Sequence, residues 1–155
     1  MRTFFALLVF GLVLVSGSPA LGDTAHGLLG PDEIQWSDGP PSLPKGSRFA
    51  VIEGKPSEAG PFTMRLRFPA GYRVPPHTHP AIEHVTVLSG LLSLGMGERF
   101  DAGKMKPMAA GSFILMPIGM THFVEAKEDT ILQLHGIGPW DVKYVNPEDD
   151  PRTKK

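Results

Sequence analysis

Two histidines and a glutamate near the middle of the chain have residue types and spacings suited to metal binding. They are His77, His79 and Glu83. On an extended backbone, side chains separated by an even number of positions point to the same side, so these three would face one way. Prolines flank the histidines and restrict the backbone that presents them. Imidazoles with a carboxylate suit Fe, Mn, Co, Ni, Cu or Zn, and such a set can hold iron that activates oxygen. The segment therefore predicts a site for one divalent metal ion.

A fourth candidate ligand, His122, lies in a second segment further along the chain. There an apolar run at 113–116 leads into Pro117-Ile118-Gly119, and His122 follows that turn. A strand that ends in a Pro-x-Gly turn would deliver the histidine directly after the turn. The second segment therefore supplies a further imidazole for the same metal ion.

The elements that must position these residues are short strands. Apolar and polar residues alternate in short runs from Phe49 onward, and turn residues separate the runs. In the clearest run, Phe62, Met64, Leu66 and Phe68 fall on one face. The chain also has 18 glycines and 16 prolines, which favour turns over helices. Further runs lie at 83–88, 91–94, 112–116, 122–125 and 130–135. This pattern predicts an all-β sandwich, jelly roll or barrel and does not choose among them.

The two segments together resemble the paired motifs of the cupin family. Residues 71–90 match G-x5-H-x-H-x3-E-x6-G, residues 111–122 match G-x5-P-x-G-x2-H, and all nine fixed positions are present. One departure is Ala126, where the second family motif commonly has asparagine. The resemblance covers 62–136 and implies a double-stranded β-helix, a jelly roll closed into a small barrel. It carries the family's metal ligands over to His77, His79, Glu83 and His122. Four protein ligands would leave one or two positions open for water, oxygen or substrate.

The whole chain divides into four predicted parts. Residues 1–22 have an early arginine, a nearly continuous apolar stretch at 4–15 and small residues before Asp23, which is typical of a secretory signal peptide cleaved after Ala20 or Gly22. The alternative, a membrane anchor, fits less well because a span needs about 20 apolar residues. We expect residues 23–47 to form an arm with one short strand at 34–36, packed on the barrel or across a dimer partner, or else a loosely held terminus. Residues 48–145 form the barrel, and 146–155 form an irregular, frayed tail.

Several other residues have a chemical type that invites a functional interpretation. Gln133 and His135 share strand parity, and on the strand after the second motif we expect either to contact substrate or to support a ligand. His84 has the opposite parity to Glu83, so it should face away from the interior. Arg65 and Arg67 lie opposite an apolar face, where a solvated outer surface is the favoured interpretation over an anion-binding site. The methionines of the second half are expected to fill the core and the pocket wall rather than to bind copper.

Composition and charge exclude several classes of function. The net charge of -1 comes from 15 basic and 16 acidic residues without a long run of either sign, so we expect no nucleic-acid partner and no stable membrane association after signal cleavage. There is no cysteine, which excludes disulfide and thiolate chemistry. The chain also resembles the cupin domain of zinc-binding anti-sigma factors. It has an export signal and no attached helical domain, so we expect no role in transcription.

The resemblance to cupins implies a metal site more firmly than any one reaction. Our leading expectation is a secreted or periplasmic metal-dependent enzyme, dioxygenase-like, that acts on a small organic molecule in the barrel. Glu83 would then double as a catalytic proton carrier. The alternatives are a non-catalytic cupin that binds a metal or small ligand, and a metal-assisted isomerase or lyase with general-base chemistry. The resemblance to cupins and the exposed edge of a jelly roll suggest a homodimer. The N-terminal arm is a candidate for a strand exchanged between the two subunits.

Overall fold

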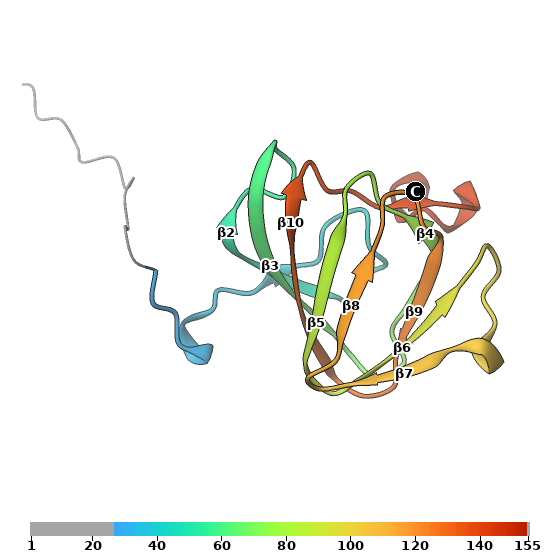
Figure 1. Cartoon of the computed structure of the whole chain (residues 1–155), viewed down its shortest axis with the longest axis horizontal. Helices are drawn as coiled ribbons and strands as arrows, with labels where there is room; N and C mark the ends of the chain where they lie inside the picture. Colours follow the sequence, from blue (N-terminus) through green and yellow to red (C-terminus); the bar gives the residue numbers. More distant parts are fainter. Residues whose placement is uncertain (1–26, 155) are drawn as a thin grey trace, which may run out of the picture.

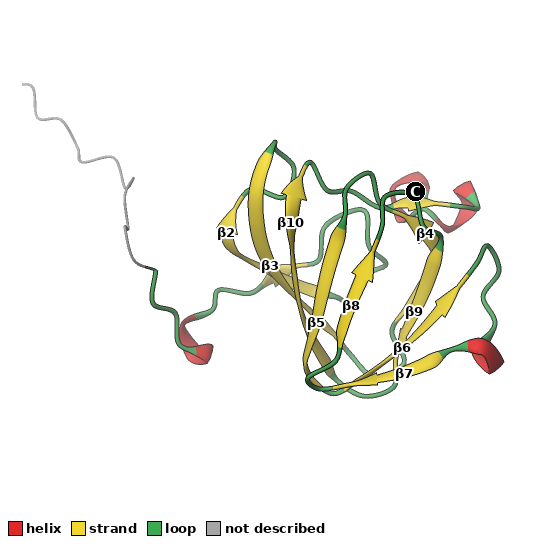
Figure 2. Ribbon diagram, viewed as in Figure 1, coloured by secondary structure: helices red, strands yellow, loops and turns green. Residues whose placement is uncertain are grey.

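The computed structural model describes residues 27–154, and it consists almost entirely of two antiparallel sheets (Figures 1 and 2). The predicted signal segment at 1–22 lies outside the described residues. The first sheet contains, in spatial order, β1 (Ser37–Asp38), β2 (Arg48–Gly54), β3 (Gly60–Phe68), β10 (Thr130–Gly138), β5 (Glu83–Ser89) and β8 (Phe113–Met116). The second contains β11 (Lys143–Tyr144), β4 (Arg73–Thr78), β9 (His122–Ala126), β6 (Leu91–Met96) and β7 (Lys106–Ala109). Single 3-10 turns are η1 (Pro31–Glu33), η2 (Ala102–Lys104), η3 (Pro147–Asp149) and η4 (Pro151–Thr153).

The two sheets face each other and enclose one hydrophobic core, so the predicted all-β jelly roll is confirmed. In β3 the predicted apolar face is the buried one, with Phe62, Met64, Leu66 and Phe68 between 1% and 3% exposed. Fully burying one such side chain contributes about 1.5–3 kcal/mol relative to leaving it exposed. Strands that are neighbours in a sheet are often distant in sequence, as where β10 lies between β3 and β5. Each motif segment contributes to both sheets, and the two segments are neighbours in each, since β5 pairs with β8 and β4 pairs with β9.

The turn between β5 and β6 requires Gly90, the last fixed position of the first motif. Gly90 connects β5 to β6 with a φ of 79°, in the left-handed region that other residues avoid. A Cβ atom at this position would lie 2.3 Å from the carbonyl oxygen of Asp129. The close approach of the two backbones therefore leaves room only for glycine.

The N-terminal arm packs on its own barrel, and its local structure differs from the prediction. The expected strand at 34–36 is absent from the described residues; the chain instead forms η1 and then β1, which pairs with β2. Further along, Leu43 is buried in the core at 5% exposure. The hydroxyl of Tyr72 donates to the Pro44 carbonyl at 2.5 Å, and that of Tyr144 donates to the Ser42 carbonyl at 2.8 Å. These contacts hold the arm over one end of the barrel.

The C-terminal segment has regular local structure that the sequence did not predict. It forms η3 and η4, and Arg152 donates to the carboxylates of Asp141 and Asp150 and to the Val142 carbonyl. Proline and charge alone predicted an irregular end, but a multiply paired guanidinium fixes it to the chain after β10. Among residues 27–154, no helix is long and apolar enough to cross a membrane.

Candidate metal centre

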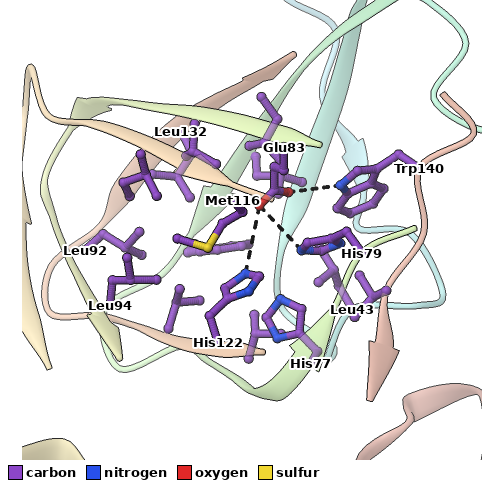
Figure 3. Close-up of a pocket in the computed structure, with 18 residues that line it drawn as sticks. Leu43, His77, His79, Glu83, Leu92, Leu94, Met116, His122, Leu132 and Trp140 are labelled. Carbon is purple, nitrogen blue, oxygen red and sulfur yellow. Dashed lines mark hydrogen bonds and ion pairs between the residues drawn. The ribbon is translucent and has the colours of Figure 1, made fainter. Parts of the chain in front are cut away.

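The four candidate ligands come from strand ends of both sheets and point into the space between them (Figure 3). His77 lies near the end of β4, and His122 begins β9, where the two residues are direct cross-strand partners. His79 follows β4, and Glu83 begins β5 in the opposite sheet. All four side chains are buried, with at most 5% of the residue exposed. Even spacing turns His77 and His79 the same way, whereas the turn after His79 brings Glu83 in from the opposite sheet.

The structure gathers the three histidines closely enough for one ion and places Glu83 beside two of them. One ring nitrogen from each of His77, His79 and His122 lies within 4.8 Å of the others, so this buried cluster could hold a metal ion. The Oε2 atom of Glu83 lies 3.4 Å from His79 Nε2 and 4.0 Å from His122 Nε2. A carboxylate oxygen therefore stands beside the imidazoles. The set of three histidines and one carboxylate is a nitrogen-and-oxygen donor set of the kind that divalent transition metals accept.

Backbone carbonyls fix which nitrogen of each imidazole faces the centre. The Nδ1 atoms of His77, His79 and His122 lie 2.7, 2.8 and 3.0 Å from the carbonyl oxygens of Pro75, Asp141 and Met120. A carbonyl oxygen can only accept, so each Nδ1 carries the proton and each Nε2 presents a lone pair. The Nε2 of His79 is buried and has no hydrogen-bond partner among residues 27–154. A buried nitrogen without a partner is costly, and a metal ion would satisfy it. The residues therefore fit a divalent metal.

Burial keeps the imidazoles in the form that ligates. Loss of solvent lowers the pKa of His79 to about 4. Burial lowers the pKa of His77 well below its usual value, and the neighbouring His122 and His79 add to this effect. Burial also lowers the pKa of His122 and raises that of Glu83. Near neutral pH the three imidazoles are therefore uncharged, as a metal ligand must be.

The cavity at the centre is small and its walls are apolar. It leaves about 40 Å³ for the centres of water-sized molecules. This is space for roughly three waters, because one water needs about 10–15 Å³ by the same measure. Besides the four ligands and Trp140, the lining residues are Leu43, Leu66, Phe68, Val74, Val85, Leu92, Leu94, Ile114, Met116, Val124, Leu132, Leu134 and Val142. Of the methionines weighed above, Met116 lines the cavity, whereas Met96 and Met120 are exposed. An ion and a very small ligand fit between these walls.

Gln133 and His135 do not reach this cavity, which corrects the expectation for both. Their neighbours Leu132 and Leu134 take the inward positions of β10. Gln133 instead accepts a hydrogen bond from Arg65 Nε at 3.1 Å on the outer face of the sheet. His135 stacks on its cross-strand partner His84, with ring centroids 4.8 Å apart. The prediction failed because it chose the polar parity of the strand as the inward one, although His84 faces outward as expected.

Sequence reasoning missed two residues that touch the site. Trp140 lies in the segment between β10 and β11, and its indole N–H donates to Glu83 Oε1 at 3.0 Å (Figure 3). Leu43 of the N-terminal arm closes the cavity wall. Neither position belongs to a motif, and the only signal in the sequence was an isolated tryptophan just beyond the last long strand.

Solved structures with the same fold come from proteins of different function. The polyketide cyclase RemF from Streptomyces resistomycificus superposes with a TM-score of 0.66 at 16% identity, covering 82% of this chain and 90% of that one. A candidate acetylacetone dioxygenase from Methylibium petroleiphilum gives a TM-score of 0.59 at 18% identity, covering 81% and 85%. At these identities the likeness establishes the fold and no activity.

Sequence comparison identifies the family. A germin-like protein 5-1 from Oryza sativa subsp. japonica is 37% identical over 67 residues, which is 43% of this chain. The matched part is 30% of the germin-like protein, so the chain spans less than a third of that relative. The model of the ChrR cupin-like domain matches residues 24–141, and therefore both motifs and all four candidate ligands. Since this match extends over most of the chain, the protein belongs to the ChrR cupin-like domain family.

Proposed function

We propose that this protein is a secreted cupin that holds one divalent metal ion through His77, His79, Glu83 and His122. The ion would serve a dioxygenase-like reaction on a small organic molecule. One observation carries the proposal: three Nε2 lone pairs and a carboxylate oxygen face a common buried space, and His79 Nε2 has no partner among residues 27–154. The export signal proposed for residues 1–22 would place the protein in the periplasm or outside the cell.

In this proposal each part of the site has a separate task. A divalent metal with open positions supplies binding and activation of oxygen or of a substrate carbonyl. The backbone carbonyls hold the three imidazoles in the tautomer with Nε2 unprotonated. The apolar walls exclude water from the centre. Glu83 Oε2 does not accept from Trp140, so this atom would bind the ion and, when it leaves the ion, would exchange a proton with substrate.

Oxygen uptake by metal-loaded protein tests the proposed reaction class. The protein is loaded with iron(II) and assayed with diketones, catechols and flavonoids in an oxygen electrode, beside a sample treated with chelator. Uptake that depends on both the metal and one compound class would support the dioxygenase. Proton exchange into a substrate without oxygen uptake would favour the isomerase or lyase alternative. Elemental analysis of protein from its own compartment identifies the native metal.

The size of the cavity favours a second candidate function, metal or small-ligand binding without turnover. The free space of about 40 Å³ is far below that of a pocket that encloses an organic substrate, about 300 Å³ or more. A substrate of that size would enter only if Leu43 or other wall residues moved. Stoichiometric metal binding with no turnover of any tested compound would identify the protein as a binder.

We also propose that two copies associate along the unpaired edge of β8, with the outward-facing side chains of that strand inside the interface. The side chains of Phe113 and Leu115 on this strand are 57% and 51% exposed. No strand of residues 27–154 pairs with the other edge of β8. The edge strand β7 of the second sheet carries Lys106 and Pro107, which discourage pairing, whereas β8 carries neither lysine nor proline. The contrast indicates an edge kept open for a second copy.

Leu115→Lys is expected to convert the dimer to a monomer, because it places a charge in the centre of an apolar interface. Sedimentation velocity measures the mass of both proteins at the same concentration. Met96→Lys is the matched control, since Met96 is 48% exposed on a strand of the other sheet and should leave the dimer intact. A monomeric wild-type protein, or a dimer that survives Leu115→Lys, would contradict the proposed interface.

A further inference from the structure

One tryptophan touches two of the four candidate ligands at once. Trp140 is 8% exposed, and its indole N–H donates to Glu83 Oε1 at 3.0 Å. The face of the same indole stacks on the His79 ring, with centroids 5.1 Å apart and planes inclined by 19°. Figure 3 shows the indole on the side of Glu83 and His79 that faces away from His122. A single side chain therefore limits the movement of a carboxylate and an imidazole of the centre.

The hydrogen bond decides which oxygen of Glu83 is available. A carboxylate on a flexible side chain can turn either oxygen, or both, toward an ion. Here the indole occupies Oε1, and Oε2 is the atom that lies 3.4 Å from His79 Nε2. The arrangement favours binding of the ion through one oxygen. Groups that orient metal ligands in this way commonly contribute about tenfold to a hundredfold in metal affinity.

The chain around Trp140 is itself tied down. The Trp140 backbone N–H donates to the Pro56 carbonyl at 2.6 Å, and the next carbonyl, that of Asp141, accepts from His79 Nδ1 at 2.8 Å. Arg152 in η4 donates to both carboxylate oxygens of Asp141, at 3.0 and 3.1 Å, and to the Val142 carbonyl at 2.8 Å. The C-terminal segment therefore braces the element that holds Glu83 and His79.

We infer that Trp140 is a positioning residue of the metal centre: it fixes Glu83 through the indole N–H and His79 through stacking, and it reports occupancy of the centre. The inference rests on the proposed metal function. Trp140 would act through Glu83 and His79 rather than by contact with the ion. An indole next to these ligands is close enough to a bound Co²⁺ ion for its fluorescence to be quenched. The chain contains only one other tryptophan, Trp36, so the signal can be isolated.

The contact with Glu83 can be tested without metal. A proton–nitrogen correlation spectrum of metal-free protein should show two indole N–H signals, and Trp36→Phe assigns them by removing one. The signal of Trp140 is expected to exchange slowly with solvent and to shift clearly in Glu83→Ala. A Trp140 signal that exchanges freely, or that Glu83→Ala leaves unmoved, would overturn the inference. This measurement uses the intact indole and so does not depend on the folding of a Trp140 variant.

The effect on the metal is measured with Co²⁺. Trp140→Phe keeps an aromatic ring over His79 but has no donor for Glu83, so its Co²⁺ affinity should fall by about tenfold to a hundredfold with the stoichiometry unchanged. Trp36→Phe is the matched control; it should bind Co²⁺ as the wild type does and show quenching of the remaining tryptophan. Circular dichroism confirms the fold of each variant.

The possible outcomes separate this inference from the proposed function. A folded Trp140→Phe protein with wild-type Co²⁺ affinity, or a Trp36→Phe protein that binds Co²⁺ without quenching, would overturn the positioning role while the metal site stands. A wild-type protein that takes up no Co²⁺ would overturn the metal site itself.

Discussion

Replacing His79 with alanine is expected to lower metal affinity by about a hundredfold or more while the barrel remains folded. Four-ligand protein sites bind zinc with roughly 10–16 kcal/mol, so one ligand accounts for about 3 kcal/mol, which is about a hundredfold in affinity. The substitution also removes a buried Nε2 that has no partner among residues 27–154, so the metal-free protein loses no hydrogen bond at that atom. Elemental analysis after dialysis and a competition titration measure the loss, and circular dichroism monitors the fold.

His84→Ala is the matched control for this substitution. His84 is also a histidine of the first motif segment, but it lies on the outer face of β5, where it stacks on His135. It should bind one ion per chain as the wild type does. Full metal occupancy in His79→Ala would show that the ligand assignment is wrong. A clear loss in His84→Ala would show instead that the outer face takes part in binding.

Removal of the metal with a chelator is expected to lower the melting temperature of the wild-type protein by roughly 10–20 °C. An ion that binds only the folded state, at a free concentration about a thousandfold above its Kd, adds about 4 kcal/mol to the free energy of unfolding. For a domain of this size that energy corresponds to the stated shift. The metal-free site also keeps a buried carboxyl group, whose pKa burial raises, beside a nitrogen that has no hydrogen-bond partner among the described residues. Both features cost stability until an ion is bound.

Differential scanning calorimetry with and without chelator measures this shift. The His79→Ala protein provides the control: with a Kd about a hundredfold higher, the same free metal adds only about 1.4 kcal/mol, so chelation should lower its melting temperature by about a third as much. Equal melting temperatures for metal-loaded and chelated wild type would contradict a metal that is part of the folded structure. An equal shift in His79→Ala would show that the chelator acts elsewhere.

The candidate ligands could be predicted because their arrangement follows from local geometry. In an extended chain the relative orientation of His77 and His79 depends only on parity, and the turn before His122 is specified by proline and glycine. The inward position of Glu83 depends in addition on the turn at 79–82, which leads into the opposite sheet. The alternation of Phe62, Met64, Leu66 and Phe68 likewise specified a strand and its buried face. Such features are encoded within a few residues and need no knowledge of distant partners.

The alternation of residues along one strand does not say which face points into the core. In β10 the face predicted to point inward points outward. Gln133 and His135 point outward because Leu132 and Leu134 bury more apolar surface when they face the core. Leu132 and Leu134, which are apolar, were the residues in the sequence that indicated the correct inward face of β10. Polar residues of chemically interesting type were given more weight than the apolar ones beside them.

The sequence by itself determined most of the longer strands, the turns between them and the set of candidate ligands, because each depends on neighbours in the chain. Only the tertiary structure decided that Trp140 holds Glu83, that Leu43 closes the cavity, that Arg152 orders the C-terminal segment and how small the cavity is. These features depend on packing between segments that are up to about a hundred residues apart, as in the hydrogen bond from Tyr144 to Ser42. No local periodicity records such contacts, since they arise when the sheets close and the arm around Leu43 and the segment after β10 pack against them.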